Sequence, residues 1–383
     1  MREASKTTST GTASDIPLDI YVRSRQIELA KALEHKKAIY LDIKFWIILR
    51  DIVEGLRSDP TEIELLSLLR EGVAKERFFC PISDSTFAEL LKKADLKSRE
   101  VTADLIDELS LGITLIPYDM RAGTELAHFL HSALKPYEVY PLDHLVWSKL
   151  SYVMGFLHPH GTPFDPATEL KMQKMFFEHM WTLSMREMID RIGNRALPDP
   201  GHFDTIAGRL NELNAQHAAD LRSFAQTYEL EVHGILDIFM DVAIDIVSQM
   251  VPEEHGEGPP LSLEQRTEEG RQLHNLLFAA FKMEATKGAL PSLHIPASLH
   301  AAVRWNKQQR LKANDFLDFR HATAALGYCD AFFTERSLRS LVTASHIALD
   351  RRYGCHVVAS SADAVACLRG LLDLPGKDAE ELS

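Results

Sequence analysis

The chain is poor in the residues that mark several specialised protein classes. Its 383 residues include only four cysteines, 19 glycines and 17 prolines. The cysteines form no C-x-x-C pair and have no histidines at zinc-finger spacing, so neither a structural zinc site nor a disulfide framework is indicated. The low glycine and proline content excludes collagen-like and low-complexity architectures. A reducing compartment is the simplest expectation for such a chain, and we expect it to be cytoplasmic.

Long uncharged apolar segments are also missing. The best candidate, residues 38–53, is interrupted by four charged residues and is shorter than the roughly 18 apolar residues that a membrane span needs. We therefore expect no membrane association. The first 16 residues lack the apolar core of a signal peptide, so we predict a disordered start over 1–16. We also predict a flexible tail over 371–383.

Positive charge is in the minority. The 42 lysines and arginines against 55 acidic residues give a formal charge of −13, which excludes a surface that is basic throughout but permits a local basic groove. The sequence contains no P-loop, no G-x-G-x-x-G and no G-x-S-x-G motif. Nothing in it therefore favours a nucleotide triphosphatase, a dinucleotide-binding enzyme or an α/β-hydrolase.

Five short apolar runs, each bounded by turn residues, are typical of buried strands. They are residues 38–42, 78–82, 113–116, 329–333 and 355–359. Helical periodicity flanks most of them, which indicates an α/β fold with a parallel sheet covered on both faces. The middle of the chain has helical apolar spacing and no convincing strand.

These patterns predict one α/β domain in two pieces, 36–122 and 297–370, separated by an all-helical insertion over 123–296. We expect the insertion to be a specificity or oligomerisation module. A homo-oligomer formed through it is one expectation.

Two acidic residues are expected at the carboxyl edge of the sheet. Asp42 ends the first strand (IYLD), where open α/β sheets place their ligands, although it could equally cap the following helix. Glu89 follows the second strand and could point toward Asp42. Alternatively, Thr86 and Glu89 form a T-x-x-E capping box at the start of a helix.

The segment NDFLDFRHATAALGYCDAFFTERSL, residues 314–338, predicts a helix followed by a strand. Spacing of three places Asp315, Asp318 and His321 on one helical stripe. Capping by Asp315 and a favourable helix-dipole position for Asp318 are the local alternatives. His321 could contact an acid or a phosphate, or it could be a satisfied packing residue.

Together these elements resemble the PIN-like domain nuclease superfamily. The resemblance rests on the strand ending in Asp (IYLD), the acid early in the next helix (SDSTFAEL) and the block D-x-x-H-A-x-x-A-L-x-x-C-D-x-F-x-T-E. It covers the two α/β pieces and not the helical middle. It implies a three-layer PIN-like domain with a central parallel sheet of about five strands.

The resemblance also implies a set of catalytic residues, namely Asp42, Glu89, Asp318 and Thr334, with Glu335 or Asp330 as the fourth acid. Asp42, Glu89, Asp318 and Glu335 would hold Mg²⁺ or Mn²⁺, because these hard cations prefer carboxylate oxygens. One or two such ions can activate a water and neutralise the phosphate during phosphodiester hydrolysis.

A negative site on a negative protein needs local positive charge to bind a polynucleotide. Basic residues precede the acidic helix and follow the fourth strand, and the nucleic-acid-binding candidates among them are Arg304, Lys307, Arg310, Lys312, Arg336 and Arg339. An ordinary solvated surface is the alternative explanation.

The sequence therefore predicts a metal-dependent endonuclease that cleaves single-stranded or looped RNA, leaving 5′-phosphate and 3′-hydroxyl ends as the resemblance implies. Two alternatives remain open. One is a catalytically inactive PIN-like scaffold that binds RNA or a protein partner. The other is a DNA-directed nuclease of the same chemistry.

Overall fold

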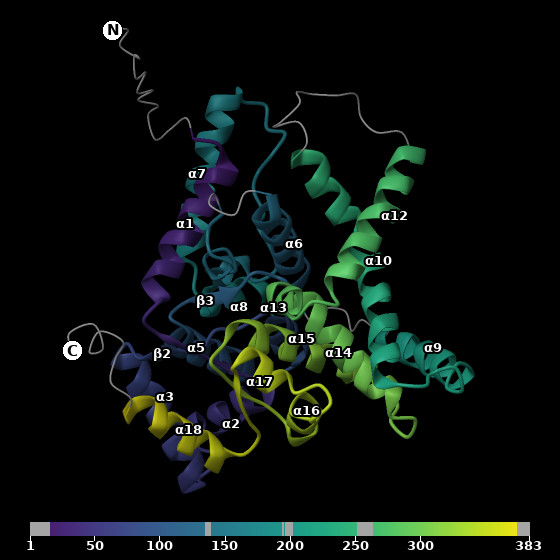
Figure 1. Cartoon of the computed structure of the whole chain (residues 1–383). Helices are drawn as coiled ribbons and strands as arrows, with labels where there is room; N and C mark the ends of the chain where they lie inside the picture. Colours follow the sequence, from purple (N-terminus) through teal and green to yellow (C-terminus); the bar gives the residue numbers. More distant parts are fainter. Residues whose placement is uncertain (1–15, 135–138, 194, 196–201, 251–262, 374–383) are drawn as a thin grey trace, which may run out of the picture.

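A computed structural model describes residues 16–134, 139–193, 195, 202–250 and 263–373, which form a mostly helical chain around a small parallel sheet (Figure 1). The strands of this sheet lie in the order β2-β1-β5-β6. Their bounds are Lys37–Leu41 for β1, Phe78–Phe79 for β2, Ala331–Phe333 for β5 and His356–Val358 for β6. All three neighbouring pairs are parallel. The sheet therefore joins β1 and β2 to β5 and β6, two pairs of strands more than 250 residues apart in the sequence.

The third predicted strand, over 113–116, does not join this parallel sheet. It forms β3 (Ile113–Leu115), which pairs antiparallel with β4 (Trp147–Lys149). A single parallel bridge between Thr114 and Ile82 connects β3 to the segment after β2. We expected a parallel sheet of about five strands, but the parallel sheet has four. The arrangement of helices around a parallel sheet is still that of an α/β fold. The expectation of no strand within 123–296 was wrong, because the three residues of β4 are too few to give a period-2 signal.

Successive residues of β1 enter two different cores, as the pleat of a strand requires. Tyr40 packs in the core that contains α14 (Pro291–Trp305) and α15 (Ala313–Tyr328). Ile39 and Leu41 pack in the opposite core. The helices that contribute to that opposite core include α2 (Ile43–Val53), α3 (Pro60–Ala74), α5 (Leu96–Ser110) and α18 (Ser361–Asp373). Helices therefore cover both faces of the sheet.

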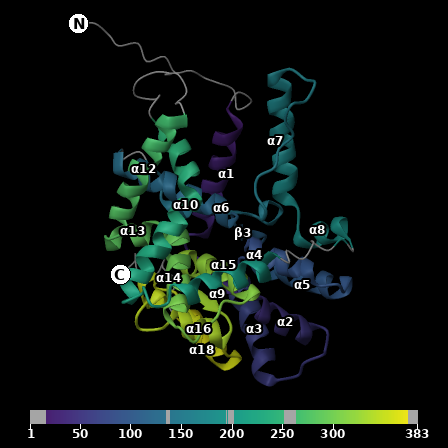
Figure 2. The same ribbon diagram turned by 90° about the vertical axis from the view of Figure 1, so that its right-hand side faces the viewer.

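The middle of the chain builds a third, helical core. It unites α6 (Tyr118–Leu134), α10 (Phe224–Met250), α12 (Leu263–Ala280) and the outer side of α14. Both views place the free ends of α7 (Pro166–Thr182) and α12 on the side of the molecule away from α3 and α18 (Figures 1 and 2). The other helices are α1 (Leu18–Leu33), α4 (Asp84–Lys92), α8 (Met185–Ile192), α9 (His202–Gln216), α13 (Glu284–Ala289), α16 (Arg336–Val342) and α17 (Leu349–Tyr353), with 3₁₀ turns at Leu142–His144 and Leu150–Tyr152.

The predicted disordered start and flexible tail lie outside the described residues, except for residue 16 and for 371–373, the last turn of α18. Across the described ranges, no helix combines the length and the apolar character needed to cross a bilayer.

The packing of α3 on the sheet makes a testable prediction at Gly72. A Cβ at this position would lie 1.7 Å from Cζ of Phe78, which is fully buried in β2. Overpacking should outweigh the better helix propensity of alanine, so we expect Gly72→Ala to lower the free energy of unfolding by about 1–2 kcal/mol. At Gly208 in α9 a Cβ would meet no atom within 4 Å, so Gly208→Ala is the matched control. Urea unfolding measures both, and a stabilised Gly72→Ala would contradict the packing.

Candidate functional site

The carboxyl ends of the parallel strands bring several polar side chains to one edge of the sheet. Asp42 follows β1, Thr334 and Glu335 follow β5, and α4 begins shortly after β2. Because parallel strands end together, segments nearly 300 residues apart meet here. Asp42, Thr334 and Glu335, which the sequence singled out, therefore lie at this edge.

Asp42 is held by a side chain from the neighbouring strand. Its carboxylate is 2% exposed and accepts a hydrogen bond from Oγ1 of Thr334, at 2.7 Å. Its backbone N–H donates to the carbonyl of Phe333 at 3.0 Å. Asp42 does precede α2, but its side chain makes no capping hydrogen bond. The carboxylate is therefore oriented toward the sheet edge, and the capping interpretation does not hold.

Glu89 is likewise not part of a helix cap. The helix α4 begins at Asp84 with Ser83 as its N-cap, so Thr86 lies inside the first turn and the predicted capping box is wrong. Oγ1 of Thr86 is instead 3.0 Å from the hydroxyl of Tyr40. The Glu89 carboxylate is left to reach His321, with 2.7 Å between Oε2 and Nε2.

His321 lies at the centre of a buried hydrogen-bonded chain. Its ring is fully buried, with Nδ1 2.7 Å from the hydroxyl of Tyr40 and Nε2 against Glu89. The Tyr40 hydroxyl continues the chain to Oγ of Ser83, at 2.6 Å. Burial by itself lowers the pKa of His321, but Tyr40, Glu89 and Asp42 outweigh it and raise that pKa well above its ordinary value. The imidazole therefore supplies positive charge to the acids around it.

Asp318, one turn before His321 on α15, completes the acidic group. Burial and, after it, the negative charge of Asp42 raise the pKa of Asp318 to about 7, with smaller contributions from Glu335 and Glu89. His321 acts in the opposite direction. Asp318 is thus electrostatically coupled to all the acids predicted for this site except Asp330.

The donor set fits a divalent cation. Asp42, Glu89 and His321 each offer one ligand atom, and these atoms all lie within 4.8 Å of one another. Within the described part of the chain, no lysine or arginine forms an ion pair with Asp42, Glu89, Asp318 or Glu335. Carboxylate oxygens suit Mg²⁺ and Mn²⁺, whereas Nε2 of His321 is already hydrogen-bonded to Glu89.

The two candidates for the fourth acid lie at opposite ends of β5. Glu335 follows Thr334 at the carboxyl edge and is exposed. Asp330 precedes β5, where its carboxylate accepts hydrogen bonds from Nζ of Lys37 at 2.7 Å and from N–H of Ala38 at 2.9 Å. Asp330 therefore belongs to the amino edge and is not part of the acidic group, because the length of the strand separates it from Asp42.

The first residue of the predicted stripe has a local role. The carboxylate of Asp315 accepts a hydrogen bond from the N–H of Lys312 at 2.8 Å, so it satisfies the start of α15. The predicted stripe of Asp315, Asp318 and His321 thus contributes only its last two members to the acidic group.

The predicted basic residues divide into engaged and unengaged side chains. Arg304 pairs with Glu231 at 2.9 Å, and Nε of Arg339 donates to the carbonyl of Val357 at 3.2 Å. The exposed side chains among them that form neither an ion pair nor a hydrogen bond with the described residues are those of Lys307, Arg310, Lys312 and Arg336. Arg336 directly follows Glu335, so one unengaged cation lies beside the acidic group.

Sequence reasoning missed the residues that support this group from behind. Tyr40, Ser83 and Thr86 are all buried and connect β1, α4 and α15 through His321. A tyrosine in an apolar strand carries no local signal of such a role. The only available sign was the need for a partner for any buried tyrosine hydroxyl.

The chain matches no protein-family model, no curated protein and no solved structure.

The crowding of carboxylates predicts that Asp318→Asn stabilises the metal-free protein. Because the pKa of Asp318 is raised to about 7 on folding, the folded state keeps its proton longer than the unfolded state does. Ionisation of Asp318 therefore lowers the free energy of unfolding as the pH rises from about 4 to about 7, and this loss is complete above about pH 7. We expect Asp318→Asn to raise the melting temperature in EDTA at about pH 8, and far less at about pH 4.

Asp330→Asn is the control for this stability measurement, because it removes a carboxylate that is ion-paired with Lys37. It should leave the melting temperature unchanged or lower it. A fall in melting temperature for Asp318→Asn at about pH 8 would contradict the electrostatic argument.

Proposed function

We propose that the chain is a metal-dependent endonuclease that hydrolyses phosphodiester bonds of RNA, in single-stranded or looped segments. The observation that carries the proposal is the convergence of Asp42, Glu89 and His321 ligand atoms within 4.8 Å at one sheet edge, with Asp318 coupled to them. The resemblance to the PIN-like nuclease superfamily supports the same conclusion through the IYLD and D-x-x-H-A motifs.

Asp42 and Asp318 would be the primary ligands of Mg²⁺ or Mn²⁺, with Glu89 as a further ligand that His321 holds from the buried side. Glu335 is the fourth acid in this assignment, since it lies at the same edge and Asp330 does not. A bound ion supplies a polarised water and neutralises the phosphate oxygens.

The protein's own side chains orient the acids and exclude water. Thr334 donates a hydrogen bond to Asp42, which fixes the direction of that carboxylate. His321 and Tyr40 hold Glu89 from the buried side. Preorganised carboxylates need little rearrangement on binding a cation, because the fold has already opposed their mutual repulsion. Asp42 and His321 are both buried and Glu335 is exposed, so bulk water reaches the group from the side of Glu335.

The substrate side would use the unengaged cations. Arg336 lies next to Glu335, and Lys307, Arg310 and Lys312 lie on the segment that leads into α15. Such side chains bind phosphates of any sequence, so affinity should fall with rising salt. Unpaired RNA is favoured because the resemblance implies it, and 5′-phosphate and 3′-hydroxyl products would follow.

Cleavage of end-labelled RNA tests the proposal. The purified chain should cut single-stranded RNA in Mn²⁺ and, more slowly, in Mg²⁺, and it should be inactive in EDTA. Asp42→Asn and Asp318→Asn should each reduce the rate by about 100-fold or more, and Thr334→Val by about 10- to 100-fold, because Thr334 acts on a ligand. The rates are read from denaturing gels.

Asp330→Asn is the matched control for the cleavage assay, since it makes the same chemical change at the other end of β5. It should retain cleavage. Loss of activity in Asp330→Asn with retention in Glu335→Gln would reverse the assignment of the fourth acid. A chain that cuts neither RNA nor a matched DNA strand in either metal contradicts the nuclease proposal, whereas faster cutting of the DNA strand favours the DNA-directed alternative.

Metal binding separates the enzyme from the inactive scaffold. Calorimetric titration of the wild-type chain with Mn²⁺ should show saturable binding, and Asp42→Asn should abolish it, because removal of a buried carboxylate ligand leaves an incomplete site. Asp330→Asn should bind as the wild type does. A wild-type chain that binds neither Mn²⁺ nor Mg²⁺ is the result expected of a scaffold.

A further inference from the structure

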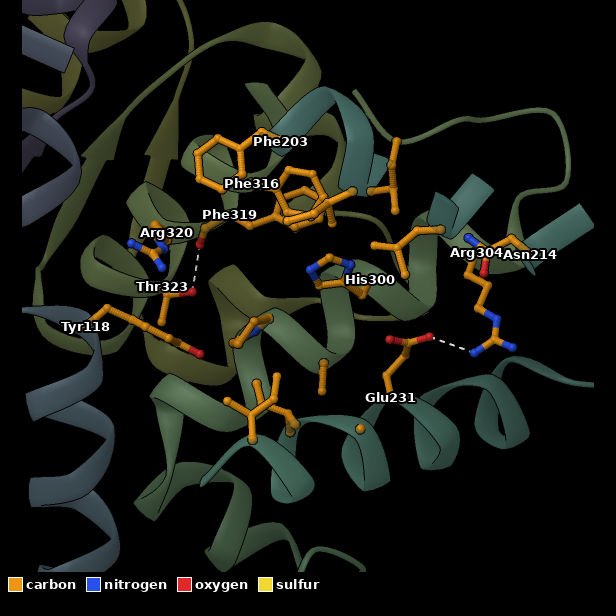
Figure 3. A pocket seen from close by; sticks show the side chains of 18 residues that line it. Tyr118, Phe203, Asn214, Glu231, His300, Arg304, Phe316, Phe319, Arg320 and Thr323 are labelled. Carbon is orange, nitrogen blue, oxygen red and sulfur yellow. Dashed lines mark hydrogen bonds and ion pairs between the residues drawn. The ribbon is translucent and has the colours of Figure 1, made fainter. Parts of the chain in front are cut away.

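A second candidate site lies on the other side of α15. Residues advance by about 100° along a helix, so Phe316, Phe319 and Thr323 share the face opposite to Asp318 and His321. That opposite face lines a cavity of about 490 Å³. The volume falls within the roughly 300–1,000 Å³ typical of small-molecule sites. The cavity lies between α9, α10, α14 and α15, with Tyr118 of α6 at one end (Figure 3).

One wall of the cavity is aromatic. The rings of Phe203 and Phe316 stack with centroids 5.4 Å apart. Phe319 meets the imidazole of His300 edge-on, at 5.0 Å and 88°. Ile235 and Ile238 of α10 provide an aliphatic side. Flat ring surfaces facing aliphatic side chains form a slot that suits a planar ligand.

His300 points into the middle of this slot (Figure 3). It contacts Phe316 and Phe319 but makes no hydrogen bond to any residue of the described ranges. Burial lowers the pKa of His300, while Glu231 and Asp315 act against this, so the ring is neutral and offers one donor and one acceptor. A ligand with a hydrogen-bonding substituent would satisfy this imidazole, which has no hydrogen-bond partner in the apolar slot.

Cationic groups are found at both ends of the slot (Figure 3). Arg304 is already paired with Glu231, although its Nε is buried with no partner in the described part of the chain. Arg320 lies over the ring of Tyr118 at 5.4 Å, and its nearest carboxylate oxygen, on Asp84, is 4.0 Å away. No hydrogen bond joins Arg320 to another described residue. Its guanidinium therefore has donors available for an anion.

We propose that this cavity binds a small planar aromatic anion, with its rings in the slot between Phe316, Phe319 and Ile235 and its anionic group on Arg320. His300 then makes the second polar contact. The lining charges support an anion, because two arginines face a single glutamate, Glu231. A carboxylate and a phosphate satisfy the same guanidinium fork, so an aromatic carboxylate and a nucleoside monophosphate share this chemistry.

Calorimetric titration of the full chain with 2-naphthoate and, separately, with 5′-AMP tests this site. We expect saturable one-to-one binding of at least one of them, and the stronger of the two identifies the anionic group. Arg320→Gln should weaken binding of the stronger ligand at least tenfold, because the cationic contact holds the anionic group. Arg320→Lys and His300→Phe should each weaken it by a smaller factor than Arg320→Gln does. The neutral analogue 2-naphthylmethanol and the non-planar cyclohexanecarboxylate should each bind at least tenfold more weakly.

Two variants separate this site from the rest of the molecule. Arg23→Gln removes an exposed arginine of α1, outside the cavity, and should bind the anion as the wild type does. Asp318→Asn alters the acidic group on the opposite face of α15 and should also leave anion binding unchanged. Binding of neither anion, equal binding of the neutral analogue, or an unchanged affinity in a folded Arg320→Gln would each overturn the proposal.

Discussion

The hydrogen-bonded imidazole of His321 is the constraint on which the sheet edge depends. It joins Tyr40 of β1 to Glu89 of α4 from its own position on α15, so one ring fixes three segments relative to one another. A buried ring with both nitrogens satisfied tolerates little movement, because breaking either contact leaves a polar group without water. The ring also fixes Glu89, which it contacts, and Asp318, which lies one helical turn before it on α15.

Much of this edge could be predicted from local sequence, because the signals are themselves local. The apolar runs ending at Asp42 and before Thr334 are β-strands, and parallel pairing then brings their ends together without further information. The placement of Glu89 and Asp318 was predicted through the family resemblance. A ligand atom of Glu89 lies within 4.8 Å of one of Asp42, and the charge of Asp42 raises the pKa of Asp318. The sequence pattern could not decide whether each acid caps a helix or belongs to the acidic group.

The errors have different physical causes, and partners distant in sequence explain the first of them. Thr86 and Glu89 match a capping box, yet Tyr40 and His321 compete for both side chains and Ser83 starts the helix instead. Asp330 resembles a ligand in the motif, but it precedes β5 and therefore lies at the amino edge of the sheet, where it pairs with Lys37. The antiparallel pairing of β3 with β4 was unpredictable because β4 contains only three residues.

The sheet pairs strands from opposite ends of the chain, and this has a consequence for protein synthesis. Asp42 and Thr334 are 292 residues apart, so a ribosome working at about 5–20 residues per second needs roughly 15–60 seconds between them. During that interval β1 has a free edge where β5 will later pair, and such edges invite association with other chains. The free edge of β1 on the nascent polypeptide therefore needs cover, from the chain's own helices or from a chaperone, until β5 leaves the exit tunnel.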